Sequence, residues 1–180
     1  MKHFNLKQFK CKCKELPADA WMYVDKLVDN ILDPVADKFM KPIKVLSGYR
    51  CEKHCTKVGG PSQMVGQHTC GQAAAVCAET EGYANMSDWK QADMEIARLI
   101  LKCGRFDYLI LEGVGEQDLM PATVHVSYNP RLNHGIVMKK VVGQVGYQEL
   151  TTEEIASLLG SGFRVQDSSS RFGVARRICD

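Results

Sequence analysis

The stretch GQHTCGQAAAVC, residues 66–77, decides how the rest of the chain is interpreted. It places His68 shortly before a run of small apolar residues, and the run 73–79 (AAAVCAE) predicts a short buried strand. A histidine at this spacing before small residues also suits a metal site, which would need a carboxylate where Ala75 stands. Three interpretations follow: a metal site, a metal site that has lost a ligand, or an ordinary buried strand.

The composition is that of a soluble globular domain. The 180 residues are 45% apolar and 24% charged, and 23 basic residues against 21 acidic ones give a net charge of +2. This balance indicates no nucleic-acid partner and no membrane partner. No apolar run approaches the roughly 20 residues that span a bilayer, and the N-terminus lacks the apolar region of a signal peptide. We expect a chain that is cytoplasmic as synthesised, and the sequence does not indicate its oligomeric state.

Eight cysteines are scattered along the chain, and none forms the paired C-x-x-C pattern of a structural zinc site. We expect reduced thiols in a reducing compartment. Cys11 and Cys13 form a C-x-C motif that could hold a metal or form a crosslink. The alternative is that they are two half-exposed thiols at the end of a short helix.

Helical patterns and capping residues predict four helices. These are residues 5–10 with Asn5 as N-cap, 17–42 with a kink or restart at Pro34, 87–102 with Ser87 as N-cap, and 151–160 with a Thr151–Glu154 capping box. No clear periodicity follows residue 160, and we expect a loose tail there.

Strands are expected at residues 43–50, 73–79, 106–112 and 122–128, with one or two weaker strands within 135–147. The third and fourth would pair as an antiparallel hairpin. Residues 51–66 contain two adjacent glycines and Pro61, so we expect a long irregular loop there. The order of elements predicts an α+β fold in which helices pack on one small antiparallel sheet.

His125 is the second histidine of interest. It alternates with Thr123 and Ser127 along its strand, so three polar side chains share one face. Such a face suits a functional site, although a strand histidine can also be a hydrogen-bonded structural residue. His68 has the same two interpretations.

The order of motifs resembles that of the zinc D-alanyl-D-alanine carboxypeptidase family. The motifs are SGYR (47–50), VGG (58–60), QHTCGQA (67–73), FDYLILE (106–112) and HVSY (125–128). That family includes phage peptidoglycan endopeptidases and shares its metal fold with hedgehog signalling domains. The resemblance implies a peptidase domain over residues 1–148, followed by a C-terminal helix and tail over 149–180.

The resemblance also implies site residues, zinc as cofactor and a peptidoglycan peptide as substrate. His68 and His125 match two zinc ligands, while Ala75 stands where the family has its aspartate ligand. Ala122 stands where the family has an acidic general base. Arg50 matches an active-site arginine that would stabilise an oxyanion or hold a substrate carboxylate.

The departures from the family pattern leave two imidazoles where a catalytic zinc wants three protein ligands. Cys77, on the same strand face as Ala75, and Cys70, in the turn after His68, are the candidate replacement ligands. Glu112 is the nearest acidic candidate for the general base, and whether it faces His125 depends on strand register.

Three hypotheses follow. The chain is a zinc peptidase whose aspartate has been changed, or a natural pseudoenzyme that binds peptidoglycan peptide or a protein partner, or an active enzyme with a rearranged site that uses Cys70 or Cys77. We expect hydrolysis of peptidoglycan stem-peptide bonds to be impaired, with reduced or lost zinc affinity. The resemblance implies a chain that meets the cell wall on lysis, as phage endolysins do, and the sequence does not indicate which bond is cut.

Overall fold

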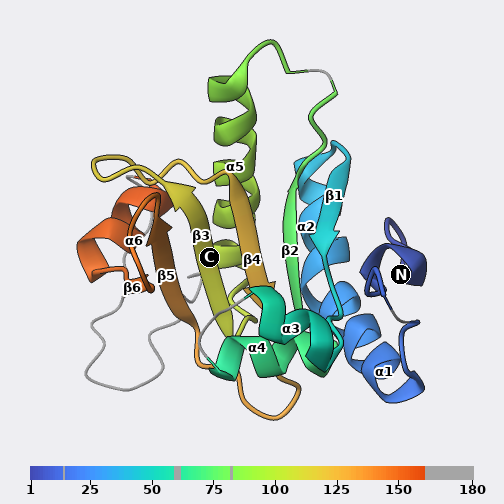
Figure 1. Cartoon of the computed structure of the whole chain (residues 1–180). Helices are drawn as coiled ribbons and strands as arrows, with labels where there is room; N and C mark the ends of the chain where they lie inside the picture. The colour runs from blue at the N-terminus through green and yellow to red at the C-terminus, as the bar shows by residue number, and fades with distance from the viewer. Residues whose placement is uncertain (14, 59–61, 82, 161–180) are drawn as a thin grey trace.

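The computed structural model describes residues 1–13, 15–58, 62–81 and 83–160, so the tail expected after residue 160 lies outside the described residues (Figure 1). The elements are η1 (Leu6–Phe9), α1 (Ala18–Leu27), η2 (Val28–Leu32), α2 (Asp33–Phe39), β1 (Ile43–Ser47), α3 (Glu52–Val58), α4 (Ser62–Thr69), β2 (Ala73–Ala78), α5 (Met86–Cys103), β3 (Tyr108–Val114), β4 (Thr123–Ser127), β5 (Ile136–Val141), β6 (Gln148–Glu149) and α6 (Thr152–Leu159). Within these residues, no helix combines the length and the apolar character needed to cross a membrane.

A six-stranded sheet organises the molecule, with strand order β1-β2-β4-β3-β5-β6. The expected hairpin of β3 and β4 is confirmed, and every pair is antiparallel except β3 with β5. The expectation of a purely antiparallel sheet was therefore wrong at one pair. Strands β2 and β3 occupy both edges of β4, so β5 pairs with the free edge of β3. It runs parallel to β3. The prediction of an α+β fold is confirmed.

The two faces of the sheet have different surroundings. Alternate residues of the central strands join the main apolar core with α1, η2, α2 and α5: Ala74, Val76, Leu109, Leu111, Val124 and Val126. Because side chains alternate along a strand, Ala75, Ile110 and His125 point to the opposite face. Helices α3 and α4 lie before that face at one end of the sheet (Figure 1). The candidate site residues therefore lie on the sheet face that the core helices leave uncovered.

The prediction of an irregular loop at residues 51–66 was wrong, because most of this segment forms the short helices α3 and α4. Two smaller corrections concern helix ends. Asn85, not Ser87, caps α5 by accepting a hydrogen bond from the Asp88 amide at 3.0 Å. The helix expected to end at Pro42 ends earlier, at Met40, whose φ is +57°.

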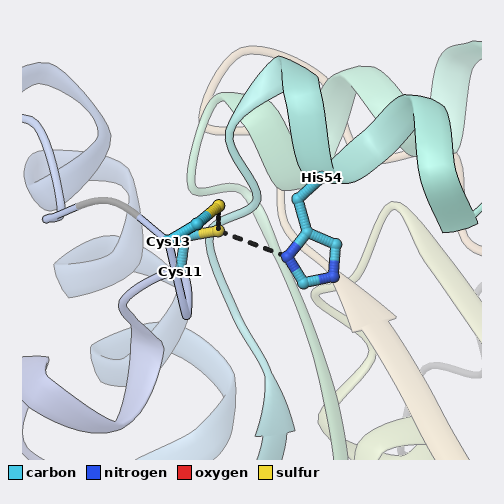
Figure 2. A group of neighbouring side chains, drawn as sticks. All are labelled: Cys11, Cys13 and His54. Carbon is cyan, nitrogen blue, oxygen red and sulfur yellow. Dashed lines mark hydrogen bonds between the residues drawn. The ribbon is translucent and has the colours of Figure 1, made fainter.

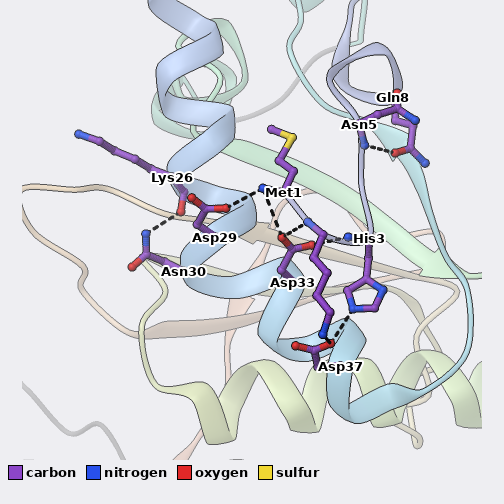
Figure 3. Close-up of polar contacts among 10 residues, drawn as sticks. Met1, His3, Asn5, Gln8, Lys26, Asp29, Asn30, Asp33 and Asp37 are labelled. Atoms are coloured by element: carbon purple, nitrogen blue, oxygen red, sulfur yellow. Dashed lines mark hydrogen bonds and ion pairs between the residues drawn. The ribbon is translucent and has the colours of Figure 1, made fainter.

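The predicted break near Pro34 takes the form of a π-helical turn, η2, between α1 and α2. Proline lacks an amide hydrogen and clashes with the preceding turn, so the regular α-helical bonding pattern changes there. Carboxylates of η2 and α2 then hold the N-terminal segment (Figure 3). Asp33 accepts hydrogen bonds from the amides of Lys2 and His3 at 2.6 and 2.9 Å, and Asp29 pairs with the Met1 amine at 3.2 Å.

This anchoring leads the chain into η1, where Asn5 and Gln8 form a capping box, confirming Asn5 as the cap. Phe4 and Phe9 are buried in the main core. The chain then passes to Cys11 beside the end of β1, close to the candidate site.

The C-terminal helix α6 begins with the predicted capping box of Thr151 and Glu154. Leu158 and Leu159 are buried in the same core as the sheet, and the Arg98 Nε donates to the Leu158 carbonyl at 2.8 Å. The division of the chain at residue 148 stays a prediction.

Candidate metallopeptidase site

Two buried histidines from distant parts of the sequence meet on the open face of the sheet. His68 lies in the last turn of α4 and His125 in the middle of β4, and only 1% and 4% of their surfaces are exposed. Their ring centroids are 5.0 Å apart and the rings meet edge to face at 75°. The structure thus brings together the two histidines that the sequence singled out.

One hydrogen bond fixes the chemistry of the pair. The Nδ1 of His68 lies 2.6 Å from the carbonyl oxygen of Gly48, which can only accept, so Nδ1 carries the proton and Nε2 keeps a lone pair. The Nε2 atoms of both His68 and His125 are buried and have no hydrogen-bond partner among the described residues. A backbone carbonyl that holds one ring nitrogen while the other is left free is typical of metal-binding histidines.

The SGYR motif builds the wall beside His68. The Arg50 Nε donates to the Ser47 hydroxyl at 2.8 Å, and the Arg50 amide donates to the His68 carbonyl at 3.2 Å. Gly48 packs so closely on η1 that a Cβ at this position would lie 2.7 Å from the Phe9 Cα. Only glycine fits there, and this fit places the carbonyl that orients His68.

The backbone around Gly71 explains why the motif has a glycine three residues after His68. Its φ is +76°, and a Cβ there would collide with the Ala20 carbonyl of α1. The Gly71 amide donates to the His68 carbonyl at 3.2 Å. The residue therefore ends α4 and turns the chain into β2 at once.

Ala75 lies directly opposite His125 in the register of β2 and β4. Directly opposed residues of an antiparallel pair point to the same face, with Cβ atoms about 4.5–5.5 Å apart. A carboxylate at position 75 would therefore reach the histidine pair. The methyl group of Ala75 has no atom that can bind a metal.

The two candidate replacement ligands differ in their surroundings. Cys77 is buried on β2 opposite Lys44 of β1, and burial, followed by the nearby Asp93, raises the pKa of its thiol to about 11. Cys70 is exposed beyond the end of α4. Among the described residues, His68 and His125 belong to no group of three His, Cys, Asp or Glu side chains whose ligand atoms all lie within 4.8 Å of one another. The assignment of Cys70 and Cys77 as replacement ligands stays a prediction that this geometry does not support.

Glu112 lies on the same sheet face as the histidines. Ile110 is directly opposite His125 and Glu112 is opposite Thr123, so Glu112 is a diagonal neighbour of His125. Its carbonyl accepts a hydrogen bond from the Ala122 amide at 2.8 Å, which places Glu112 beside Ala122, where the resemblance implies an acidic residue. Burial raises the pKa of Glu112, while Lys140 and Arg50 act to lower it.

Lys140 and Tyr147 also belong to this region, and sequence reasoning missed both. Lys140 is the partner of Glu112 in the parallel register of β3 and β5, and its Nζ lies 5.4 Å from the centre of the Tyr147 ring. Burial and then Glu112 raise the pKa of Tyr147, and Arg50 lowers it, so the phenol lies close to both charges. No sequence signal could find them, because a parallel neighbour for β3 was not expected.

The comparison with known protein families shows to which family the chain belongs. A family model described as Peptidase M15 matches residues 2–97, slightly more than half of the chain. This chain belongs to the Peptidase M15 family. The match contains Arg50, His68 and position 75, and it ends before Glu112 and His125. The relationship predicted from the order of five motifs is thereby confirmed.

Among solved structures, this M15 chain is similar to the crystal structure of the L-Ala D-Glu endopeptidase ChiX of Serratia marcescens. The two are 22% identical, the likeness covers 63% of this chain and 89% of that one, and the TM-score is 0.38. A search of curated proteins found no match.

The electrostatics of the M15 site favour neutral imidazoles. Burial, followed by the charge of Arg50, lowers the pKa of His68 to about 3. Burial lowers the pKa of His125 well below its usual value, and His68 and Arg50 lower it further. Both rings are therefore uncharged at neutral pH, which is the state that binds a metal.

Peptidases of the M15 family depend on zinc, so the ligand set can be compared with what zinc requires. Two neutral Nε2 atoms fit two of the three protein ligands of a catalytic zinc. Position 75, where the third would lie, carries no donor atom. The residues present thus fit the metal only in part.

A groove beside Arg50 carries positive charge. It has a volume of about 460 Å³, within the range of ligand-binding sites. Its lining includes Lys7, Lys10 and Lys12 from the N-terminal segment, together with Ser47 and Arg50. Such a groove is suited to a ligand that carries carboxylates.

Proposed function

We propose that this chain is a peptidase-type domain that binds peptidoglycan stem peptide and whose hydrolysis of that peptide is impaired by the alanine at position 75. The observation that carries the proposal is the pairing of Ala75 with His125, beside two buried Nε2 atoms that have no partner among the described residues. A site of this kind keeps the scaffold of the M15 centre and lacks one ligand.

The groove beside Arg50 supports the choice of substrate. Peptidoglycan stem peptides carry free carboxylates along a short, extended chain. Arg50 lines the groove and is held by the Ser47 hydroxyl, and its charge lowers the pKa of both His68 and His125. We assign Arg50 to the binding of a substrate carboxylate or carbonyl oxygen, because a fixed guanidinium forms charge-assisted hydrogen bonds with either group.

Glu112 is the residue that we assign as general base. In peptidases of this kind the bound zinc polarises the scissile carbonyl and lowers the pKa of water, and a carboxylate takes the proton. Glu112 is half-buried on the face of His125 and beside Ala122, and burial raises its pKa, which makes its carboxylate a stronger base. Its position thus compensates for the alanine at 122.

A second candidate function is binding without hydrolysis. Two positions that carry acidic groups in the family carry alanine here, Ala75 and Ala122. A natural pseudoenzyme that holds peptidoglycan peptide or a protein partner in the Arg50 groove would need neither group.

The experiment compares the unmodified protein with Ala75→Asp and with Ala75→Asn as a matched control of the same shape. Zinc content is measured by mass spectrometry, and cleavage of purified muropeptides by chromatography. We expect Ala75→Asp to hold one more zinc per chain than the other two proteins and to cleave faster. Equal cleavage by the unmodified protein and Ala75→Asp would contradict the impairment. Binding of muropeptide by all three proteins, with cleavage by none, would favour the pseudoenzyme.

A further inference from the structure

Two sulfur atoms, of Cys11 and Cys13, and the imidazole of His54 lie together where the N-terminal segment meets the start of α3 (Figure 2), and the Cys51 sulfur lies beside them. The Sγ of Cys13 lies 3.3 Å from that of Cys11 and 3.1 Å from that of Cys51, and Cys11 and Cys51 are 3.7 Å apart. The Nδ1 of His54 lies 3.4 Å from the Cys11 Sγ. This cluster, which we call the Cys3His cluster, is separate from the pair of His68 and His125.

The sulfur separations are slightly shorter than those of ligands around one metal ion. Zinc–sulfur bonds of about 2.3 Å at tetrahedral angles place two sulfur ligands about 3.8 Å apart, and a nitrogen ligand slightly closer. A disulfide would instead bring two sulfurs to about 2.05 Å and leave the third thiol and the imidazole unused. Cys11, Cys13 and His54 form a group of three potential ligands whose atoms all lie within 4.8 Å of one another, and the Cys51 Sγ lies within 3.7 Å of both other sulfurs.

The local backbone supports four-ligand binding. Cys11 and Cys13 form a C-x-C motif, while Cys51 and His54 form a C-x-x-H motif. The His54 amide donates to the Cys51 carbonyl at 2.9 Å, so the first turn of α3 presents both side chains to the same side. Three thiolates and one neutral imidazole are a standard donor set for structural zinc.

We propose that Cys11, Cys13, Cys51 and His54 bind a structural zinc ion that fastens the N-terminal segment to the segment carrying Arg50. Cys51 directly follows Arg50 in sequence, and Cys11 lies two residues after Phe9, which packs against Gly48. A metal at this point would hold both walls of the Arg50 groove. The site would be closed by four protein ligands and so would serve structure, not catalysis.

The proposal does not depend on the proposed function, and zinc counting separates the two. We expect one zinc per chain in the unmodified protein, none in Cys51→Ser and two in Ala75→Asp. The double variant Cys51→Ser/Ala75→Asp should hold one. Loss of zinc in Cys51→Ser but no gain in Ala75→Asp would support the Cys3His cluster and contradict the reading of position 75. The reverse pattern would overturn the cluster alone.

Cobalt(II) identifies the ligands directly. Cobalt added to reduced, metal-free protein should give a thiolate-to-cobalt charge-transfer band and the visible spectrum of a tetrahedral ion. Cys51→Ser should lose most of this signal. Cys103→Ser, which removes a half-buried cysteine at the end of α5 outside both sites, should keep all of it. A spectrum without the charge-transfer band would overturn the proposal.

Two further measurements apply if Cys51→Ser fails to fold. His54→Ala removes a half-buried ligand on the first turn of α3 and should lower bound zinc while leaving the sheet intact. In the unmodified protein, a chelator should expose three additional thiols to an alkylating reagent and lower the melting temperature. Full alkylation without chelator, or an intact mass that shows a disulfide in freshly purified protein, would contradict the zinc site.

Discussion

Ala75 and His125 occupy directly opposed positions on the neighbouring antiparallel strands β2 and β4. The Gly48 carbonyl orients the nearby His68 ring, and the turn at Gly71 joins the helix that carries His68 to β2. A carboxylate at position 75 would lie beside His125, so the stability of variants at this position tests whether a third ligand belongs there.

Ala75→Asp should make folding stability depend more strongly on zinc than it does in the unmodified protein. Without metal, a carboxylate buried opposite His125 lacks a partner, so we expect a loss of ~1–3 kcal/mol in the free energy of unfolding. Zinc at 100 times its dissociation constant should return about 2.7 kcal/mol. Thermal melts with and without zinc measure both effects. Ala75→Asn should lose stability in the same way, and an equally large recovery with zinc in that control would argue against carboxylate ligation, because zinc in the Cys3His cluster should stabilise both variants alike.

Gly48→Ala should destabilise the protein because the new Cβ would lie 2.7 Å from the Phe9 Cα. We expect a loss of about 1–3 kcal/mol, as for overpacked core positions. Gly66→Ala is the matched control, because Gly66 lies within α4 and a Cβ there has no atom within 4 Å. Alanine favours helix, so this variant should gain up to ~1 kcal/mol. Urea unfolding of both variants tests the contrast, and equal effects would refute it.

Glu112→Gln in the Ala75→Asp background should lower kcat by about 10²–10⁴-fold, the usual contribution of a general base. Zinc content should not change, because Glu112 is not assigned as a ligand. Glu149→Gln is the control, since Glu149 is an exposed carboxylate on β6. Muropeptide cleavage rates give the comparison, and unchanged kcat in Glu112→Gln would remove Glu112 from the proposed mechanism.

The buried histidines should make the protein sensitive to acid. The pKa of His68 is lowered to about 3 and that of His125 lies well below its usual value, against about 6.5 in an unfolded chain. Below pH 6.5 the unfolded chain therefore binds protons that the folded chain refuses, and stability falls with pH by ~1.4 kcal/mol per pH unit for each histidine. Above pH 6.5 neither histidine makes folding stability depend on pH. Urea titrations from pH 7 to pH 4 should show a shallower fall for His125→Leu, and an identical slope would contradict this assignment.

Asp93 should make folding stability depend on pH in the opposite direction. Its carboxylate is buried on α5, where burial raises its pKa to about 7 although the Ala78 amide donates to it at 2.6 Å. The folded chain then holds a proton that the unfolded chain releases near pH 4, so this stabilisation is complete below pH 4 and is lost as pH rises through 7. Asp93→Asn should flatten that part of the pH profile. A profile unchanged by the substitution would show that Asp93 is ionised in the fold.

Much of the fold followed from local patterns. The alternation of apolar residues identified the central strands, and the capping residues Asn5 and Thr151 marked two helix starts correctly. The helices α3 and α4 were missed because each spans only two turns and depends on tertiary packing more than on propensity. The parallel pairing of β3 and β5 was missed because strand order is a property of the whole sheet.

The candidate site was also predictable only in part from the sequence. His68, His125 and Arg50 could be named because short motifs carry them, and the structure brings His68 and His125 into contact. Tyr147 carries no motif and reaches the site only through its neighbours Glu112 and Arg50. For the Cys3His cluster, the C-x-C pair was visible in the sequence as a metal candidate. Its partners could not be identified, because Cys51 and His54 stood in a segment expected to be irregular.

The strand order has a consequence for amide hydrogen exchange. His125 lies on β4, which is bonded on both edges by β2 and β3, so its amides should exchange only when the whole sheet opens. Arg50 lies beyond the end of the edge strand β1, where opening takes less free energy. A ligand that bridges these two residues would protect the rim of the sheet much more than its centre, and the pattern of slowed exchange would map its footprint.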